Sequence, residues 1–228
     1  MNLGDRAWPE VPAATLLVPL GALEQHGPHL PLDTDARIAA AVADRAAAAD
    51  PALLVAPPLA YGASGEHEGF PGTLSIGHEA LRAVLVELGR SAFRWASRLV
   101  LVNGHGGNLP TVQDAVARLR DEGRDAVWSP CVVAGGDAHA GRTETSILLA
   151  LDPDAVRLDV AEPGATAPLA ELFPALRAGG VAAVSPNGVL GDPTGANAPE
   201  GERLLSEMAA ALGTRIARWR PNATARLT

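Results

Sequence analysis

The chain of 228 residues contains no lysine, and its only cysteine is Cys131. A single cysteine excludes a disulfide framework within one chain, and it excludes a zinc site built from several thiolates. The 18 basic residues are all arginines, and 26 acidic residues outnumber them, for a formal net charge of −8. An acidic chain without a cluster of basic residues is a poor match for nucleic acid or an anionic membrane, so we expect neither as a partner.

Long apolar runs and export signals are also missing. No run reaches the roughly 18 apolar residues that a membrane-spanning helix needs. The N-terminal stretch MNLGDRAWPE has no basic segment followed by an apolar one, so no secretory signal is visible. With 47% hydrophobic and 19% charged residues, the composition is that of a globular protein. We therefore expect a soluble, cytoplasmic protein with a single domain over residues 1–228.

Short apolar runs alternate with segments of helical periodicity. The runs at residues 15–20, 53–56, 98–102 and 125–133 predict buried strands, and residues 181–184 also favour a strand. Thr34 is expected to cap a helix that carries Ile38, Ala41, Val42 and Ala46 on one face. Apolar residues three and four apart predict further helices over residues 81–95, 109–119, 147–151 and 204–219. Residues 187–199 are expected to form a long loop. The alternation predicts an α/β fold, with a mainly parallel sheet and helices on both faces.

Histidines and acidic residues gather where the predicted strands end. Five of the six histidines lie in loops after these strands, close to acidic residues; the set comprises Glu24, His26, His29, Asp35, Glu66, His67, His105, His139 and Glu144. Ligands of parallel α/β sheets bind beyond the carboxyl ends of the strands, so we expect these side chains to converge. Glu24 and His26, two apart in extended backbone, point to the same side. Mixed histidine and carboxylate ligands suit Zn²⁺, Mn²⁺ or Fe²⁺ rather than Ca²⁺.

Each of these residues also has a purely structural interpretation. A histidine at a strand end is often a hydrogen-bonded loop residue, and Asp35 would also favour the N-terminus of a helix. Residues 66–68 fit a solvated loop, and His78 fits a solvated or capping position at a helix start. The pairing of histidine with acid at several strand ends is what favours a metal site over these interpretations.

Three other motifs are incomplete. Leu109 stands where a dinucleotide-binding fingerprint that begins at Gly104 needs its third glycine. Residues 62–66 lack the final glycine of a nucleophile elbow. Cys131 ends a predicted strand, where it fits a buried structural cysteine better than a nucleophile.

In their order along the chain, these residues make the sequence similar to the creatininase family of metal-dependent amidohydrolases. The resemblance covers residues 17–149 and rests on separated motifs: Glu24-x-His26-Gly-x-His29-Leu-Pro-Leu with Asp35, Glu66-His67 with Phe70-Pro71-Gly72-Thr73, Asn103-Gly104-His105-Gly106-Gly107-Asn108, and His139-Ala140-Gly141 with Glu144-Thr145-Ser146. It implies a three-layer α/β sandwich, two divalent metal ions per chain (Zn, Fe(II) or Mn) and assembly as a homo-oligomer.

The resemblance also implies a role for individual residues. It assigns Glu24, Asp35 and His105 to a first metal ion. It assigns His26, together with the same bridging Asp35, to a second ion. His139 matches the catalytic histidine of the family, a residue type suited to proton transfer near neutral pH.

One position departs from the family pattern. Creatininase itself carries a metal-ligating glutamate where this chain has Gly107. We therefore expect another carboxylate to complete the second site, and Glu144 is the candidate because it follows His139 closely in the chain. Glu66 and His67 are expected to bind substrate or to support the metal ligands.

Within the family, residues 56–77, 136–146 and 185–195 are similar to a branch of peptidases that act on a short modified precursor peptide. Such an enzyme releases a crosslinked, decarboxylated Val-Tyr unit from the peptide's C-terminus. The implied reaction is amide hydrolysis, with His139 protonating the leaving amine. Two alternatives stay open: a small-molecule amidohydrolase that opens a cyclic amide or removes a formyl group, and a non-catalytic binding protein on the same scaffold.

Overall fold

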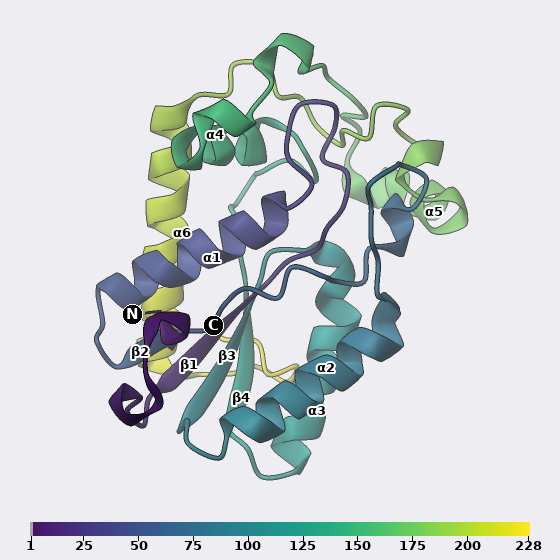
Figure 1. Cartoon of the computed structure of the whole chain (residues 1–228). Coiled ribbons are helices and arrows are strands. Elements are labelled where there is room, and N and C mark those ends of the chain that lie inside the picture. Colours follow the sequence, from purple (N-terminus) through teal and green to yellow (C-terminus); the bar gives the residue numbers. More distant parts are fainter. Residues whose placement is uncertain (1) are drawn as a thin grey trace.

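Four parallel strands form the centre of the computed structural model, which describes residues 2–228 (Figure 1). They are β1 (Thr15–Leu20), β2 (Leu53–Val55), β3 (Arg98–Asn103) and β4 (Ala126–Pro130). The strands lie in the order β2-β1-β3-β4, and every neighbouring pair is parallel. The inner strands β1 and β3 are buried along almost their whole length, as their continuous apolar runs predict.

Helices cover both faces of this sheet. On one face lie α1 (Thr34–Ala48), α4 (Arg142–Leu151) and α6 (Ala198–Arg218), and on the other lie α2 (Gly77–Ala92) and α3 (Leu109–Asp121) (Figure 1). Alternate residues of each strand enter opposite cores, so that Leu17 packs with α1 and α6 while Leu16 packs with α2 and α3. The predicted three-layer α/β architecture with helices on both faces is confirmed.

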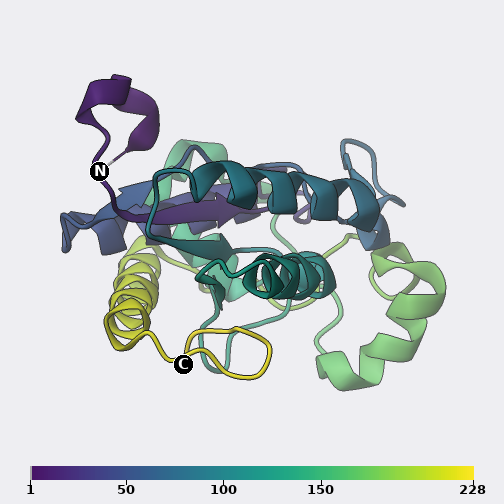
Figure 2. The same ribbon diagram turned by 90° about the horizontal axis from the view of Figure 1, so that it is seen from below.

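The region after residue 160 differs from the prediction. A helix that was not predicted, α5 (Leu169–Gly179), contains Pro174 and has no buried residue, so its sequence shows no core-facing stripe. Figure 2 shows α5 at one end of the molecule, away from the sheet. The predicted strand at residues 181–184 is wrong. The chain turns at Gly180 with φ 69° and forms a short 3-10 helix over Val181–Ala183 instead.

Several element boundaries also move. Thr34 is the first residue of α1 rather than its cap, and its hydroxyl donates to the carbonyl of Pro31 at 2.7 Å. Helix α4 begins at Arg142, earlier than predicted, and strand β4 ends at Pro130 instead of Val133. None of the helices within residues 2–228 has the length and apolar character needed to cross a lipid bilayer.

Candidate metal centre

The loops that leave the carboxyl ends of the four strands bring the predicted residues together. Glu24 and His26 follow β1, His105 follows β3, and His139 lies in the loop between β4 and α4. Asp35 lies in the first turn of α1. All five side chains are buried, with at most 7% of each residue exposed. The loop after β3 approaches α1 so closely at Gly104 that a Cβ there would lie 2.6 Å from the Asp35 carbonyl oxygen.

One group of ligand atoms consists of Glu24, Asp35 and His105. The Nε2 of His105 lies 3.2 Å from the carbonyl oxygen of Ala63, which only accepts, so Nε2 carries the proton. In the neutral ring, Nδ1 is then bare and faces Glu24 Oε2 at 3.1 Å and Asp35 Oδ2 at 3.2 Å. Neither of these oxygens has a hydrogen-bond partner. Three lone-pair donors that converge without a proton between them fit a divalent cation.

A second group is built around His26. Its Nδ1 lies 3.2 Å from the carbonyl oxygen of Glu24, and its Nε2 faces Asp35 Oδ1 at 3.1 Å and Glu144 Oε2 at 3.9 Å. Ligand atoms of His26, His139 and Glu144 lie within 4.8 Å of one another. Asp35 therefore directs one carboxylate oxygen to His26 and the other to His105, which is the arrangement expected of a ligand shared by two ions.

Burial and mutual contact shift the pKa values of these residues. Burial, reinforced by the Asp35 carboxylate, raises the pKa of Glu24 to about 7. Burial alone would lower the pKa of His26, but Asp35 and then Glu144 outweigh it and raise that pKa to about 10. The pKa of His105 is also raised against the effect of burial, chiefly by Glu24. The buried carboxylates thus need positive charge beside both rings, and either ring protons or bound cations supply it.

His67 and His139 form the remaining wall of the cluster. The Nε2 of His67 lies 3.3 Å from Glu24 Oε1, and the Nδ1 of His139 lies 3.7 Å from the same oxygen. Burial, followed by the charge of His105, lowers the pKa of His67 to about 4. Burial, followed by the charges of His26 and His67, lowers the pKa of His139 well below its ordinary value. Both rings are therefore neutral at pH 7.

Glu66 lies behind His105, on the side away from the other carboxylates. Its Oε1 is 3.4 Å from His105 Nε2, and its side chain is 36% exposed. Gly107 leaves room for this contact, because a Cβ there would lie 2.3 Å from Glu66 Oε1. Among the described residues, Glu66 belongs to no group whose ligand atoms lie close enough together to hold a metal ion.

The structure separates two histidines and an aspartate from the cluster. His29 and His78 contact the hydroxyls of Thr145 and Thr111 at 2.9 and 2.7 Å. Asp137 accepts backbone hydrogen bonds at the start of α4. Gln25 was not singled out from the sequence, because alternation in extended backbone would point it away from Glu24 and His26. Its side chain nevertheless reaches His67 and His139.

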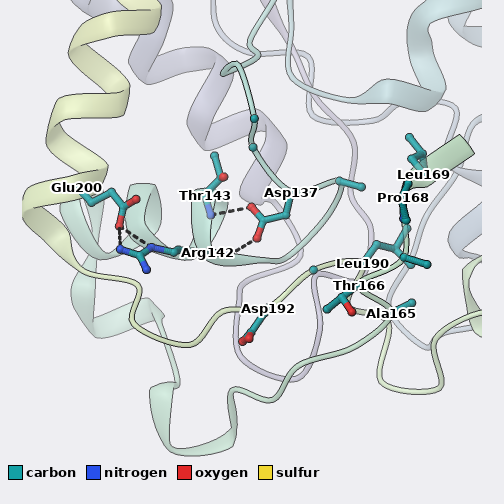
Figure 3. A pocket seen from close by; sticks show the side chains of 15 residues that line it. Asp137, Arg142, Thr143, Ala165, Thr166, Pro168, Leu169, Leu190, Asp192 and Glu200 are labelled. Carbon is teal, nitrogen blue, oxygen red and sulfur yellow. Dashed lines mark hydrogen bonds and ion pairs between the residues drawn. The ribbon is translucent and has the colours of Figure 1, made fainter.

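A cavity of about 540 Å³ lies next to the loop that carries His139, although no residue of the cluster lines it (Figure 3). It is lined by the loop before α4, including Ala138 next to His139, and by Leu169 and Leu190. Asp137 accepts from the backbone N–H groups of Arg142 and Thr143 at 2.6 and 2.9 Å, as Figure 3 shows. These bonds fix the end of the loop that carries His139 at the rim of the cavity.

Comparison with known proteins gives concordant results. The creatininase family model, described as creatinine amidohydrolase, matches residues 4–216. The mycofactocin precursor peptide peptidase of Mycolicibacterium smegmatis is 62% identical over 218 residues, which cover 93% of this chain and 88% of that protein. The creatinine amidohydrolase of Pseudomonas putida is 35% identical over 210 residues, which cover 75% of this chain and 80% of that protein. A solved creatininase mutant of the Zn-Zn type superposes with a TM-score of 0.79 at 31% identity, covering 97% of this chain and 98% of that one.

Proposed function

The chain belongs to the creatininase family, and we propose on that premise that it is the metal-dependent peptidase that cleaves the mycofactocin precursor peptide. It is a hydrolase that acts on amide bonds. In the proposed reaction, the amide bond near the C-terminus of the short modified peptide is hydrolysed, which releases the crosslinked Val-Tyr unit. The identity of 62% over 93% of the chain supports this substrate.

The buried, unpaired oxygens of Glu24 and Asp35 are the observation that carries the metal assignment. In this proposal, Glu24, Asp35 and His105 hold one divalent ion, and His26, Asp35 and Glu144 hold the second. Zn²⁺, Fe²⁺ and Mn²⁺ all suit a ligand set of imidazoles and carboxylates. Bound ions of this kind lower the pKa of a water molecule and polarise a scissile carbonyl group.

His139 transfers the proton in this proposal. Its Nε2 lies 2.8 Å from the carbonyl oxygen of Gln25, so Nε2 is protonated and Nδ1 carries the free lone pair. Nδ1 faces the cluster, where it takes a proton from the attacking water and returns it to the leaving amine nitrogen. In this proposal His67, whose Nε2 lies 3.3 Å from Glu24 Oε1, supports that carboxylate from the side.

Incubation of the metal-loaded protein with the crosslinked precursor peptide tests this function, with mass spectrometry to identify both products. We expect cleavage that releases the Val-Tyr unit and that stops when a chelator is added. Creatinine and a formamide serve as parallel substrates, because the identity of 35% to a creatinine amidohydrolase favours small amides as the second candidate. Hydrolysis of a small amide without peptide cleavage would establish that candidate, and hydrolysis of neither substrate would leave a binding protein.

We also infer, from the family resemblance, that the chain assembles as a homo-oligomer, and we propose that it works in the cytoplasm. Sedimentation of the purified protein and fractionation of the producing cells test the two statements separately.

A further inference from the structure

Gln25 joins four segments of the site through its side-chain amide and its backbone oxygen, although the residue is neither a metal ligand nor charged. Gln25 is only 5% exposed. Its Nε2 lies 2.9 Å from His67 Nδ1, 3.0 Å from His139 Nε2 and 3.1 Å from the carbonyl oxygen of Gly188. Its Oε1 accepts from the backbone N–H of Gly27 at 2.8 Å. The side-chain amide thereby bonds to two loops that are distant in sequence, at His67 and Gly188, and the backbone oxygen of Gln25 lies 2.8 Å from His139 Nε2 in a third.

A count of hydrogens determines the direction of each bond. The backbone oxygen of Gln25 only accepts, so His139 Nε2 must donate to it, and this nitrogen cannot also accept from the amide. The two N–H groups of Nε2 then match two acceptors, His67 Nδ1 and the Gly188 oxygen. A flipped amide would place two oxygens together at Gly188 and two N–H groups together at Gly27.

These bonds determine which ring nitrogen bears the proton in both histidines. His67 accepts at Nδ1, so its proton lies on Nε2, which faces Glu24. His139 carries its proton on Nε2, so its Nδ1 lone pair faces the cluster. The opposite tautomers would direct a lone pair of His67 at the Glu24 carboxylate and a proton of His139 at the place where it must accept one.

We propose that Gln25 is a positioning residue: its side-chain amide holds His67 in the Nε2–H tautomer and in the orientation that peptide hydrolysis requires, while its backbone oxygen accepts from His139. The inference rests on the proposed function, since His67 faces the same Glu24 oxygen as His139, the residue proposed to transfer the proton. The loop that closes over the amide supports it. A Cβ at Gly188 would lie 2.0 Å from Gln25 Oε1, and the positive φ of 80° at Gly188 also favours glycine. The backbone at Gly188 is thus shaped to the Gln25 side chain.

Gln25→Met tests the proposal, because it keeps the length of the side chain and removes both hydrogen-bonding groups. We expect kcat for the peptide to fall about 10–100-fold, the range typical for residues that orient metal ligands and catalytic groups. We expect KM and the bound metal content to stay near their wild-type values. Gln25→Glu is the second variant, since it keeps the shape and the acceptor for Gly27 but not the amide donor, and it should lower kcat in the same way.

A spectroscopic measurement separates this role from a merely structural one. Long-range proton–nitrogen NMR of the zinc-loaded protein with nitrogen-15 histidine reports which ring nitrogen is protonated. We expect His67 in the Nε2–H form in the wild type and a shift toward the Nδ1–H form in Gln25→Met. Asn187→Ala is the matched control, because Asn187 holds the same loop through Ser185 and Val189 but contacts no histidine.

The kinetic and NMR results for these variants decide whether Gln25 is a positioning residue. An unchanged His67 tautomer in both Gln25 variants, or unchanged kcat, overturns the proposal. An equal fall in kcat in Asn187→Ala assigns the effect to the loop and also overturns it. If the wild-type protein cleaves no peptide, the proposed function fails, while the NMR result still decides whether Gln25 sets the tautomers.

Discussion

Replacement of Asp35 by asparagine is the sharpest test of the metal centre. Asp35 directs Oδ1 to His26 and Oδ2 to His105, so both groups of ligand atoms depend on this one carboxylate. Asparagine has the same shape, but it lacks the charge and places an NH₂ group where one oxygen was. That group would point at a bare ring nitrogen in the space that a cation needs. Asp35→Asn should therefore weaken both metal sites rather than one.

The size of the effect follows from ligand linkage. An ion at 100 times its dissociation constant stabilises the folded state by about 2.7 kcal/mol. In a protein of this length, each kcal/mol shifts Tm by about 2–4 °C, so one saturated site raises Tm by about 5–11 °C. Two sites that share Asp35 should raise the Tm of the wild type by about 10–20 °C, and Asp35→Asn should lose nearly all of this increase.

Calorimetry of chelated and zinc-loaded protein measures these shifts, and plasma emission spectroscopy measures the metal content of the same samples. Asp33→Asn is the matched control, because Asp33 lies two residues away and pairs with Arg37 at 2.7 Å on the surface. It should keep the full zinc-dependent increase in Tm. A wild-type metal content in Asp35→Asn would refute the shared-ligand argument and leave Asp35 as a residue that stabilises the start of α1.

Three further predictions concern single side chains. His139→Ala should lower kcat by about 10²–10⁴-fold and retain its metal, and a loss of metal would make His139 a ligand. Glu144→Gln should lower the occupancy of one ion and leave the other, whereas a metal-bound crystal structure with Glu144 far from both ions would contradict its role. Hydrogen bonds from Arg90 and the charges of neighbouring arginines lower the pKa of Glu122 from 4.5 to about 2, so the stability that it contributes is present above pH 4.5 and lost as the pH falls toward 2. The Tm of Glu122→Gln should thus be lower than that of the wild type at pH 7 and equal to it near pH 2. A Tm that is lowered by the same amount at both pH values would exclude this linkage.

Much of the fold was predictable because burial leaves a direct trace in the sequence. The inner strands appear as continuous apolar runs, and helices such as α3 appear as stripes that match one face of the sheet. Helix α5 left no such trace, because none of its side chains enters a core. Residues 181–184 are apolar enough for a strand, but Gly180 turns the chain before any neighbour can pair with it.

The candidate site was predictable to the level of loops. Parallel strands end at one edge of a sheet, so acids and histidines after those strands had to lie near one another. The sequence could not show which imidazole nitrogen faces which carboxylate, since that depends on distant carbonyl groups such as that of Ala63. The part played by Gln25 was hidden for the same reason, because its partners come from loops more than 40 residues away.

Helix α5 has a consequence for the dynamics of the centre. It has no buried side chain, and it contacts the short turns Gly65–His67 and Val181–Ala183. Local unfolding of a native protein is easiest where few buried apolar contacts resist it. We therefore expect the amide protons of α5 to exchange with solvent through local opening, and those in the buried faces of α1 and α6 to exchange only when much of the molecule unfolds. Since the first of these turns carries His67, one side of the centre lies against the segment expected to open most easily, while Asp35 lies in α1, which is expected to exchange slowly.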